Sequence, residues 1–387
     1  MARKMSRIQI ARRISLGFFL VFSTTIAILH QKLPGFPAVD ALCPFGGLET
    51  LFKFLAGGEL LRRIEPSNIL LLVLIVVLGV LFGRFFCGWI CAFGALQGIF
   101  GSLGRRLFKK PFTVPPKADR ILRLIKYPAL LAILVWTWRV GDLVIRPYDP
   151  WPAWAHLSAG FEELWGEFKI GFIILIATLL SSVFFERTFC KYLCPLGAFN
   201  ALLSRIPLMR IKREKSTCTS CTLCNRVCPM NIKVMETDRV DSPECIACME
   251  CVTACPTKKD TLSLQFARRQ VPLWLIALLG VGIYAGSIGI ARITGLVSFT
   301  APPLTHRAAK GDLRVEDIKG SSTYADISEA FGVELEVILA QSGLSAFDIP
   351  PDTRIKDTGL VTGSEFDTDT VRFAIARILG LTYSGEH

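Results

Sequence analysis

Five long apolar runs constrain this chain more than any other feature. They are Ile14–Leu29, Ile69–Phe86, Tyr127–Ile145, Phe168–Phe185 and Val271–Ile293. Each approaches the roughly 20 residues that an α-helix needs to cross a bilayer. Hydrophobic residues make up 51% of the 387 residues, which is too many for an ordinary soluble domain. The sequence therefore predicts a mainly α, polytopic membrane protein with about five transmembrane helices.

Basic residues near the helix ends predict the orientation of the chain. They cluster in "MARKMSRIQIARR", in "GRRLFKKPF" through Lys126, in "RIPLMRIKREK" and in "FARR". If five helices cross the membrane, all four segments lie on the same side of it. We expect that side to be the cytoplasm of a prokaryote and the membrane to be the inner membrane. No small-residue cleavage site follows the first run, so we expect a retained helix rather than a signal peptide.

The formal net charge of +12 is explained by these loops, because positive charge marks the cytoplasmic side. Basic residues interleaved with aromatic ones, as in nucleic-acid-binding surfaces, are not found. We therefore expect a lipid environment and no nucleic-acid partner.

Twelve of the thirteen cysteines fall on or beside the predicted cytoplasmic side, where reducing conditions favour metal ligation over disulfides. The stretches "CTSCTLCNRVCP" and "CIACMECVTACP" each follow the pattern C-x2-C-x2-C-x3-C-P, whose fourth cysteine binds the neighbouring [4Fe–4S] cluster. A zinc site fits this doubled pattern poorly. We expect cluster one on Cys218, Cys221, Cys224 and Cys255, and cluster two on Cys245, Cys248, Cys251 and Cys228.

A second pair of motifs repeats at an offset of 103 residues. "RFFCGWICAFGA" and "RTFCKYLCPLGA" share the pattern R-x-F-C-x3-C-x2-G-A, and each follows an apolar run. This pattern predicts that the first four helices form two hairpins related by an internal repeat. We expect the four thiols to hold a third [4Fe–4S] centre, with Arg84 and Arg187 offsetting its charge. Its ligands would be Cys87, Cys91, Cys190 and Cys194.

Two other interpretations of this second motif pair stay open. The cysteines can be small apolar fillers beside arginines that anchor the membrane interface. They can also form a regulatory dithiol or a redox disulfide.

Residues from about 210 to 265 resemble a bacterial two-cluster ferredoxin, and the layout from about 10 to 295 resembles the membrane polyferredoxins of the NapH and NosR type. The resemblance rests on the two C-x3-C pairs at helix ends, the ferredoxin segment and the flanking helices. It implies electron transfer between the quinone pool, iron–sulfur centres and a partner protein. Two features depart from the pattern: Ala92 stands where proline is usual, and the large flavin-binding domain of the NosR type has no counterpart.

The opposite side of the membrane carries four candidates for proton exchange with a quinone headgroup. They are His30, Asp40, Asp149 and His156, polar groups beside apolar walls. Anchoring at the membrane interface, together with the nearby tryptophans, is the alternative. Cys43 in "CPFGGL" is either a buried small residue in a re-entrant amphipathic helix or a ligand or attachment point for a further cofactor.

The tail predicts a separate small helical domain. "SSTYADISEAFGVELEVILAQSGL" contains two short helices that stop at Gly332 and Gly343, and "DTDTVRFAIARIL" contains a third. We expect this domain to be a docking surface for a partner subunit, with an inert folded cap as the alternative. The predicted domains are a four-helix membrane domain at 1–207, a cytoplasmic α+β ferredoxin domain at 208–268, a fifth transmembrane helix at 269–297 and an extracytoplasmic domain at 298–387.

The predicted function is the relay of single electrons between a cytoplasmic-side redox partner and either the quinone pool or an extracytoplasmic partner. No residue is expected to be catalytic, and the chain is expected to act as a subunit of a larger oxidoreductase complex. Two alternatives remain: a self-contained quinone reductase, and a redox-sensing or maturation factor of a reductase system.

Overall fold

A computed structural model describes residues 5–33, 36–58, 61, 66–108, 112, 114–205, 207–257, 261–299, 303–311, 313–363 and 366–383. The chain divides into two compact units, Met1–Thr300 and Ala301–His387. The first unit contains both the apolar helices and the ferredoxin segment.

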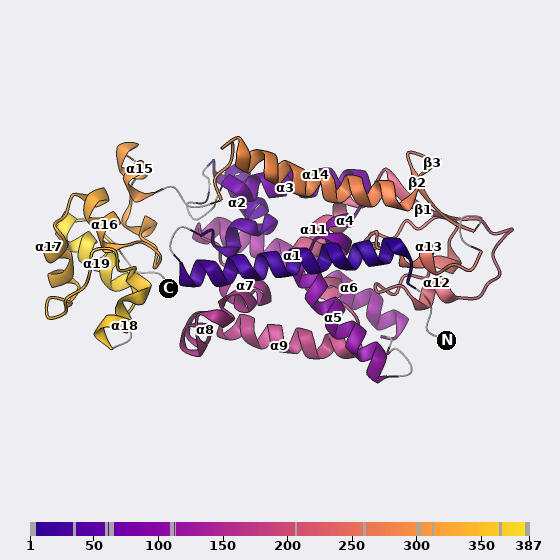
Figure 1. The fold of residues 1–387 in the computed structure, drawn as a ribbon, viewed down its shortest axis with the longest axis horizontal. Helices are drawn as coiled ribbons and strands as arrows, with labels where there is room; N and C mark the ends of the chain where they lie inside the picture. The colour runs from indigo at the N-terminus through magenta and orange to yellow at the C-terminus, as the bar shows by residue number, and fades with distance from the viewer. Residues whose placement is uncertain are drawn as a thin grey trace. The chain divides into compact units, whose positions relative to one another are not determined.

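All five predicted apolar runs form helices, but they differ in length (Figure 1). Within the described residues, three are long and apolar enough to cross a membrane: α1 (Arg7–Lys32), α6 (Pro116–Val140) and α14 (Leu273–Ile293). The other two, α3 (Pro66–Phe82) and α9 (Lys169–Phe184), are apolar but shorter. The second run therefore does not continue as one helix to Phe86, because Gly83 at a φ of 69° ends α3.

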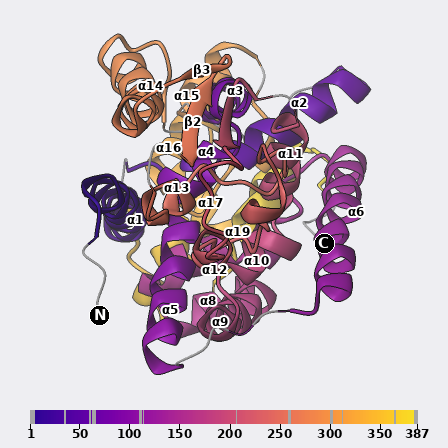
Figure 2. The ribbon, with the colours of Figure 1, turned by 90° about the vertical axis from the view of Figure 1, so that its right-hand side faces the viewer.

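The internal repeat is visible as two matching sets of three helices. In the first copy α3 is followed by α4 (Phe85–Trp89) and α5 (Ala92–Leu107); in the second, α9 is followed by α10 (Thr188–Tyr192) and α11 (Pro195–Leu203). Each helix of the second copy begins 103 residues after its counterpart. The copies exchange contacts, since α5 packs on α9 and α11 packs on α3. Similarly, α1 packs on α5 and α6 packs on α11, on opposite sides of the unit (Figure 2).

The repeat extends to the predicted outer side. The short helix η1 (Val39–Leu42) leads into α2 (Pro44–Gly57), and η2 (Arg146–Tyr148) leads into α7 (Pro150–Ala155). The first pair packs on α3 and the second on α9. Cys43 and Asp149 thus hold equivalent positions, each directly before the proline that begins a helix. After α7 come η3 (His156–Ser158) and α8 (Phe161–Glu167).

The ferredoxin segment is a small antiparallel sheet with short helices. Its strands are β1 (Met209–Arg213), β2 (Leu262–Phe266) and β3 (Arg269–Gln270), in that order across the sheet. Between β1 and β2 lie α12 (Leu223–Arg226), η4 (Val234–Glu236) and α13 (Glu250–Ala254). One apolar core joins this segment to the membrane helices, and it includes Leu78, Phe85, Trp89, Ile211, Met230, Leu264 and Ile276. The segment is therefore fixed to the helices by buried side chains.

The second unit is helical. Its helices are α15 (Leu304–Ala309), η6 (Val315–Asp317), α16 (Tyr324–Phe331), α17 (Leu335–Gln341), η7 (Ile355–Asp357), α18 (Thr358–Thr362) and α19 (Thr368–Leu379). The three helices expected from the sequence are α16, α17 and α19. Thr323 and Asp326 form a capping box at the start of α16, and Gly332 ends it in the left-handed conformation. The buried core includes Ile318, Tyr324, Ile327, Ile338, Ile355, Val371 and Ile375.

Candidate iron–sulfur centres

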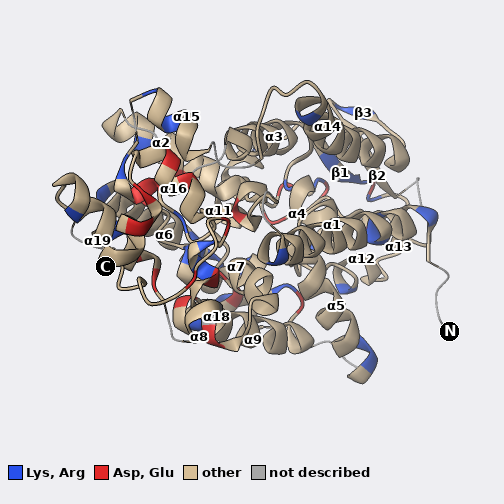
Figure 3. Ribbon diagram, turned by 60° about the vertical axis from the view of Figure 1, so that its left-hand side comes forward, with Lys and Arg blue, Asp and Glu red and all other residues tan. Residues whose placement is uncertain are grey.

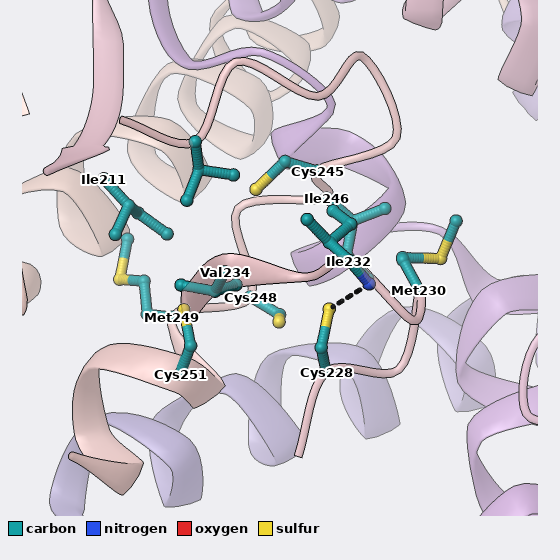
Figure 4. A pocket seen from close by; sticks show the side chains of 11 residues that line it. Ile211, Cys228, Met230, Ile232, Val234, Cys245, Ile246, Cys248, Met249 and Cys251 are labelled. Atoms are coloured by element: carbon teal, nitrogen blue, oxygen red, sulfur yellow. Dashed lines mark hydrogen bonds between the residues drawn. The ribbon is translucent and has the colours of Figure 1, made fainter. Parts of the chain in front are cut away.

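Four cysteines and a shell of apolar side chains line one cavity of the ferredoxin segment (Figure 4). The cavity and its opening to solvent together hold about 340 Å³ of space not filled by protein atoms. The cysteines are Cys228, Cys245, Cys248 and Cys251. Cys228 comes from the other motif, so this is the grouping that the spacing predicts for cluster two.

A second cavity, of about 320 Å³, is lined by the other four cysteines of the ferredoxin segment: Cys218, Cys221, Cys224 and Cys255. Its wall is more polar than the first, because Arg213, Thr257 and Thr261 also line it. The Cys255 sulfur lies 3.2 Å from the Thr257 hydroxyl oxygen. These cysteines are the set predicted for cluster one.

The two motifs share an unusual backbone geometry. Ser220 and Thr222 flank Cys221, and Ala247 and Met249 flank Cys248, all with φ between 52° and 59°. A residue other than glycine pays about 1–3 kcal/mol in this conformation, and such strain gathers at functional sites. Turns of this kind aim backbone N–H groups into an anion-binding concavity. The N–H of Ser220 lowers the pKa of the Cys218 thiol, which favours the thiolate that binds iron.

Within the described residues, no three His, Cys, Asp or Glu side chains are arranged to hold a single metal ion. Each set of four ferredoxin cysteines instead surrounds a space. That arrangement suits a multi-iron cluster, whose four corners need thiolates spread around a cube.

The paired C-x3-C cysteines have equivalent environments in the two repeats. Cys91 and Cys194 cap the N-termini of α5 and α11, where their sulfurs accept hydrogen bonds from Gly94 N at 3.3 Å and Gly197 N at 3.2 Å. The backbone angles of the two caps agree within 2°. Ala92 in place of proline therefore leaves the turn unchanged.

Two buried arginines cross between the repeats. An Arg187 Nη1 donates to the Cys87 carbonyl at 2.6 Å, and an Arg84 Nη2 donates to the Cys190 carbonyl at 3.3 Å. Gly94 and Gly197 leave room for them, since a Cβ atom there would lie 3.1 Å and 3.0 Å from the respective guanidinium nitrogens. Each repeat thus holds the cysteine turn of the other.

The four thiols of this set lie within electrostatic range of one another. Gln97 on α5 donates to the Cys190 sulfur at 3.1 Å. Arg187 is 2% exposed, and no carboxylate pairs with it in the described part of the chain. A buried cation without a counter-charge is costly, so negative thiolates beside it are the fitting partners.

The paired-cysteine turn lies directly against the loop that carries Cys245 and Cys248. A Cβ atom on Gly88 would lie 2.0 Å from the Ile246 carbonyl oxygen. The Trp89 indole donates to the Ala247 carbonyl at 3.0 Å, and the Gln9 amide donates to the Cys248 carbonyl at 2.9 Å. Backbone is therefore packed on backbone between the two sites.

On the predicted outer side, Arg146 gathers several polar groups. It pairs with Asp40 at 2.9 Å and with Glu167, and its guanidinium lies 5.1 Å from the centre of the Phe168 ring. The buried His156 ring stacks on Phe168 at 4.2 Å. Of the four outer candidates, Asp40, Asp149 and His156 lie within electrostatic range of Arg146 or of one another. His30 hydrogen-bonds with the Phe36 carbonyl at 2.7 Å.

Burial and the nearby Arg146 charge lower the pKa of His156, so its imidazole is neutral. Its Nδ1 must donate to the Pro152 carbonyl, 2.9 Å away, because that oxygen only accepts. The Nε2 is then a proton acceptor. Burial also raises the pKa of Asp149 to about 6. Cys43 lies within electrostatic range of Asp149 and Asp40, and its carbonyl accepts from Asn68 at 2.7 Å.

Two residues beside the cysteine loops, Lys126 and Glu244, were not predicted from the sequence. Lys126 was counted with a basic loop, but the structure places it inside α6, fully buried and paired with Glu244. In the sequence Lys126 follows Lys117, Arg120 and Arg123 on the same helix, so no local signal distinguishes it from its basic neighbours. The signal for Glu244 is its position directly before Cys245.

The cysteines described above fall in segments that match known iron–sulfur domains. A profile described as "4Fe-4S binding domain" matches residues 64–111 and 169–216, one match for each repeat. A profile described as "4Fe-4S dicluster domain" matches residues 210–256. No solved structure matches the chain.

Curated relatives cover most of the chain. "Uncharacterized protein MJ0750" of Methanocaldococcus jannaschii is 35% identical over 266 residues, which is 68% of this chain and 98% of that protein. "Putative electron transport protein YccM" of Escherichia coli is 30% identical over 298 residues, 74% of this chain and 81% of that protein. "Ferredoxin-type protein NapH" of Haemophilus influenzae is 27% identical over 203 residues, 50% of this chain and 67% of that protein. The chain belongs to the family of membrane-associated, ferredoxin-type 4Fe-4S electron-transport proteins that includes NapH, NosR, NirI and YccM.

Proposed function

We propose that this protein is a five-helix membrane subunit that relays single electrons through three [4Fe–4S] clusters. The path joins a cytoplasmic redox partner to the quinone pool on the outer side. Cluster one is held by Cys218, Cys221, Cys224 and Cys255, cluster two by Cys228, Cys245, Cys248 and Cys251, and the third centre by Cys87, Cys91, Cys190 and Cys194. When bound, the clusters supply sites that take up and release one electron each.

The observation that carries the proposal is the packing of Gly88 and Trp89 on the Ile246–Ala247 backbone. At Gly88 this contact brings the cysteine turn of the membrane repeat directly against the backbone of the cluster-two loop. The cluster-one and cluster-two segments are joined in turn by the packing of α12 on α13. The order of the relay is therefore cluster one, cluster two, third centre.

The side chains around the third centre hold it in a defined electrostatic environment. Arg84 and Arg187 place positive charge beside the four thiolates, which offsets negative charge away from water. Three of the sulfurs accept hydrogen bonds, from Gly94 N, Gly197 N and the Gln97 side-chain amide. Such donors stabilise the thiolates and tune the potential of the cluster.

The outer polar group supports quinone as the electron partner on that side. Reduction of a quinone needs protons as well as electrons, and oxidation of a quinol releases them. His156 Nε2 is a neutral acceptor beside the Asp40–Arg146–Glu167 group, with Phe168 as an apolar wall. These residues fit the exchange of a proton with a hydroquinone hydroxyl.

The orientation follows from the distribution of charge. The last turn of α5 contains Arg105 and Arg106, and the first two turns of α1 contain Arg7, Arg12 and Arg13. These two helix ends lie at the same end of the unit as the ferredoxin strands (Figure 3). By the positive-inside rule this end faces the cytoplasm of the inner membrane, and the second unit is then extracytoplasmic.

The relay is tested with anaerobically purified protein in liposomes. The clusters are reduced with dithionite, a short-chain quinone is added, and reoxidation is followed by the visible absorbance of the clusters. We expect rapid reoxidation in the wild type, loss of most of the rate in Cys190→Ser, and slower reoxidation with unchanged iron content in His156→Gln. If quinone reoxidises Cys190→Ser at the wild-type rate, the third centre is not on the path. If quinone leaves the wild type reduced, the quinone half of the proposal is wrong, and a sensing role or an extracytoplasmic protein acceptor takes its place.

A further inference from the structure

A buried group of three charges lies between the cluster-two loop and the paired-cysteine turn. The Glu244 carboxylate accepts from an Arg84 Nη1 at 2.6 Å and from the Lys126 ammonium. Arg84 and Lys126 are 0% exposed, and Glu244 is 5% exposed. Glu244 directly precedes Cys245, whereas Lys126 comes from α6, which carries none of the proposed ligands.

Arg84 connects this group to both sites. One of its terminal nitrogens contacts Glu244, in the cluster-two loop, and the other contacts the Cys190 carbonyl, in the paired-cysteine turn. One guanidinium thus bridges two cysteine loops that lie more than 50 residues apart in the chain. The planar guanidinium of arginine holds two donors in a fixed geometry, which suits this bridging role better than the single ammonium of a lysine would.

The group carries a surplus of positive charge, since it contains two cations and one anion. Burial removes most of the screening that water and salt would provide. Reduction of either neighbouring cluster adds one negative charge close to this surplus. The charges of the group therefore change the free energy of reducing the cluster. A positive charge favours reduction and raises the midpoint potential, whereas a negative charge lowers it.

We propose that Glu244 is a positioning residue shared by two clusters: it holds Arg84 and Lys126 between them and sets both midpoint potentials together. The inference rests on the proposed function, because it takes the cluster assignments given there. Loss of the Glu244 charge leaves two unopposed cations and raises both potentials. Loss of the Lys126 charge removes a cation and lowers both. Cluster one serves as an internal reference, because none of the three residues lines its cavity.

The test is a potentiometric EPR titration with dithionite on the anaerobically purified full-length protein. The variants are Glu244→Gln, Lys126→Gln and the double variant, with Glu236→Gln as the matched control, since Glu236 is an exposed acid of the same segment. At a fixed potential we expect the ratio of reduced to oxidised cluster to change about tenfold in each single variant. For a one-electron couple this is a shift of about 59 mV. The shifts should be opposite in sign, with the double variant near the wild type and the control unshifted.

Two results overturn the inference: shifts of the same sign in both single variants, or no shift in either variant while iron content is unchanged. If Glu244→Gln loses iron, the test rests on Lys126→Gln alone. A midpoint potential that rises or stays unchanged in Lys126→Gln then contradicts the proposal. A failure of the proposed relay can be told apart from a failure of this inference. A wild type with only two clusters refutes the third centre, and the sign test then applies to cluster two.

Discussion

Ala247 and Met249 lie on either side of Cys248 with φ of 52° and 59°, and Ser220 and Thr222 repeat this geometry around Cys221. None of the four is a glycine, the residue that would adopt the left-handed region without strain. The fold therefore stores strain at the same two places in each motif. At the scale of single residues, the shape of these loops depends on residues other than glycine held in the left-handed region.

Substitution of Ala247 tests the role of this geometry. Ala247→Val places a β-branched residue at positive φ in a buried position, and we expect it to lower the free energy of unfolding by about 1–3 kcal/mol and to reduce iron content. Ala247→Gly relieves the strain and should keep both the iron content and the thermal midpoint. Iron analysis with a thermal melt distinguishes the two, and equal behaviour of both variants would argue against a strained loop.

Gly88 is a second residue whose lack of a side chain is required. Because a Cβ atom there would lie 2.0 Å from the Ile246 carbonyl oxygen, Gly88→Ala must separate the two cysteine loops. We expect all clusters to assemble but the quinone-dependent reoxidation of clusters one and two to slow several-fold. Gly282→Ala on α14 is the control, since nothing lies within 4 Å of its added methyl group. An unchanged rate in Gly88→Ala would show that this contact does not carry the electrons.

At the scale of helices, the two repeats pack closely on each other at glycines. On α5, a Cβ atom at Gly104 would lie 1.7 Å from the Val183 carbonyl oxygen of α9. On α3, Gly79 faces Leu203 of α11 in the reciprocal contact. Small residues of this kind let membrane helices approach closely, and van der Waals contact then holds them together.

Two glycines on the same helix provide a matched test of this packing. Gly104→Ala should destabilise the protein by about 1–3 kcal/mol, because α5 and α9 must move apart. Gly98→Ala, with nothing within 4 Å, should be neutral or stabilising by up to about 1 kcal/mol through helix propensity. Thermal unfolding in detergent measures both. Equal midpoints for the two variants would contradict this close packing.

Patterns local in sequence predicted the helices, the motifs and the grouping of the eight ferredoxin cysteines, but they did not predict the side-chain contacts between helices. The apolar runs located α1, α3, α6, α9 and α14, and the 103-residue offset revealed the repeat. Sequence patterns gave no sign that α3 would end at Phe82, because the apolar run continues through Phe86 while a single glycine turns the chain. The repeat placed Arg84 and Arg187 near the four thiols, but the carbonyl that each contacts lies about 100 positions away and depends on tertiary packing, as does the Asp40–Arg146 pair.

At the scale of the whole molecule, the chain consists of two units with separate cores. All twelve proposed ligands lie in the first unit, which also provides every side chain placed around them. A chain that ends at Thr300 should therefore insert into the membrane and retain its full iron content. Iron analysis of the purified truncated protein checks this, and a loss of clusters would mean that the second unit supports the first.

The central claim is that the paired cysteines of the two repeats hold a third cluster. Quantification of iron and acid-labile sulfide in anaerobically purified protein tests it most directly. For the wild type the account predicts about twelve iron atoms and as many sulfides per chain, and for a Cys190→Ser, Cys194→Ser double variant about eight of each. About eight of each in the wild type as well would contradict it.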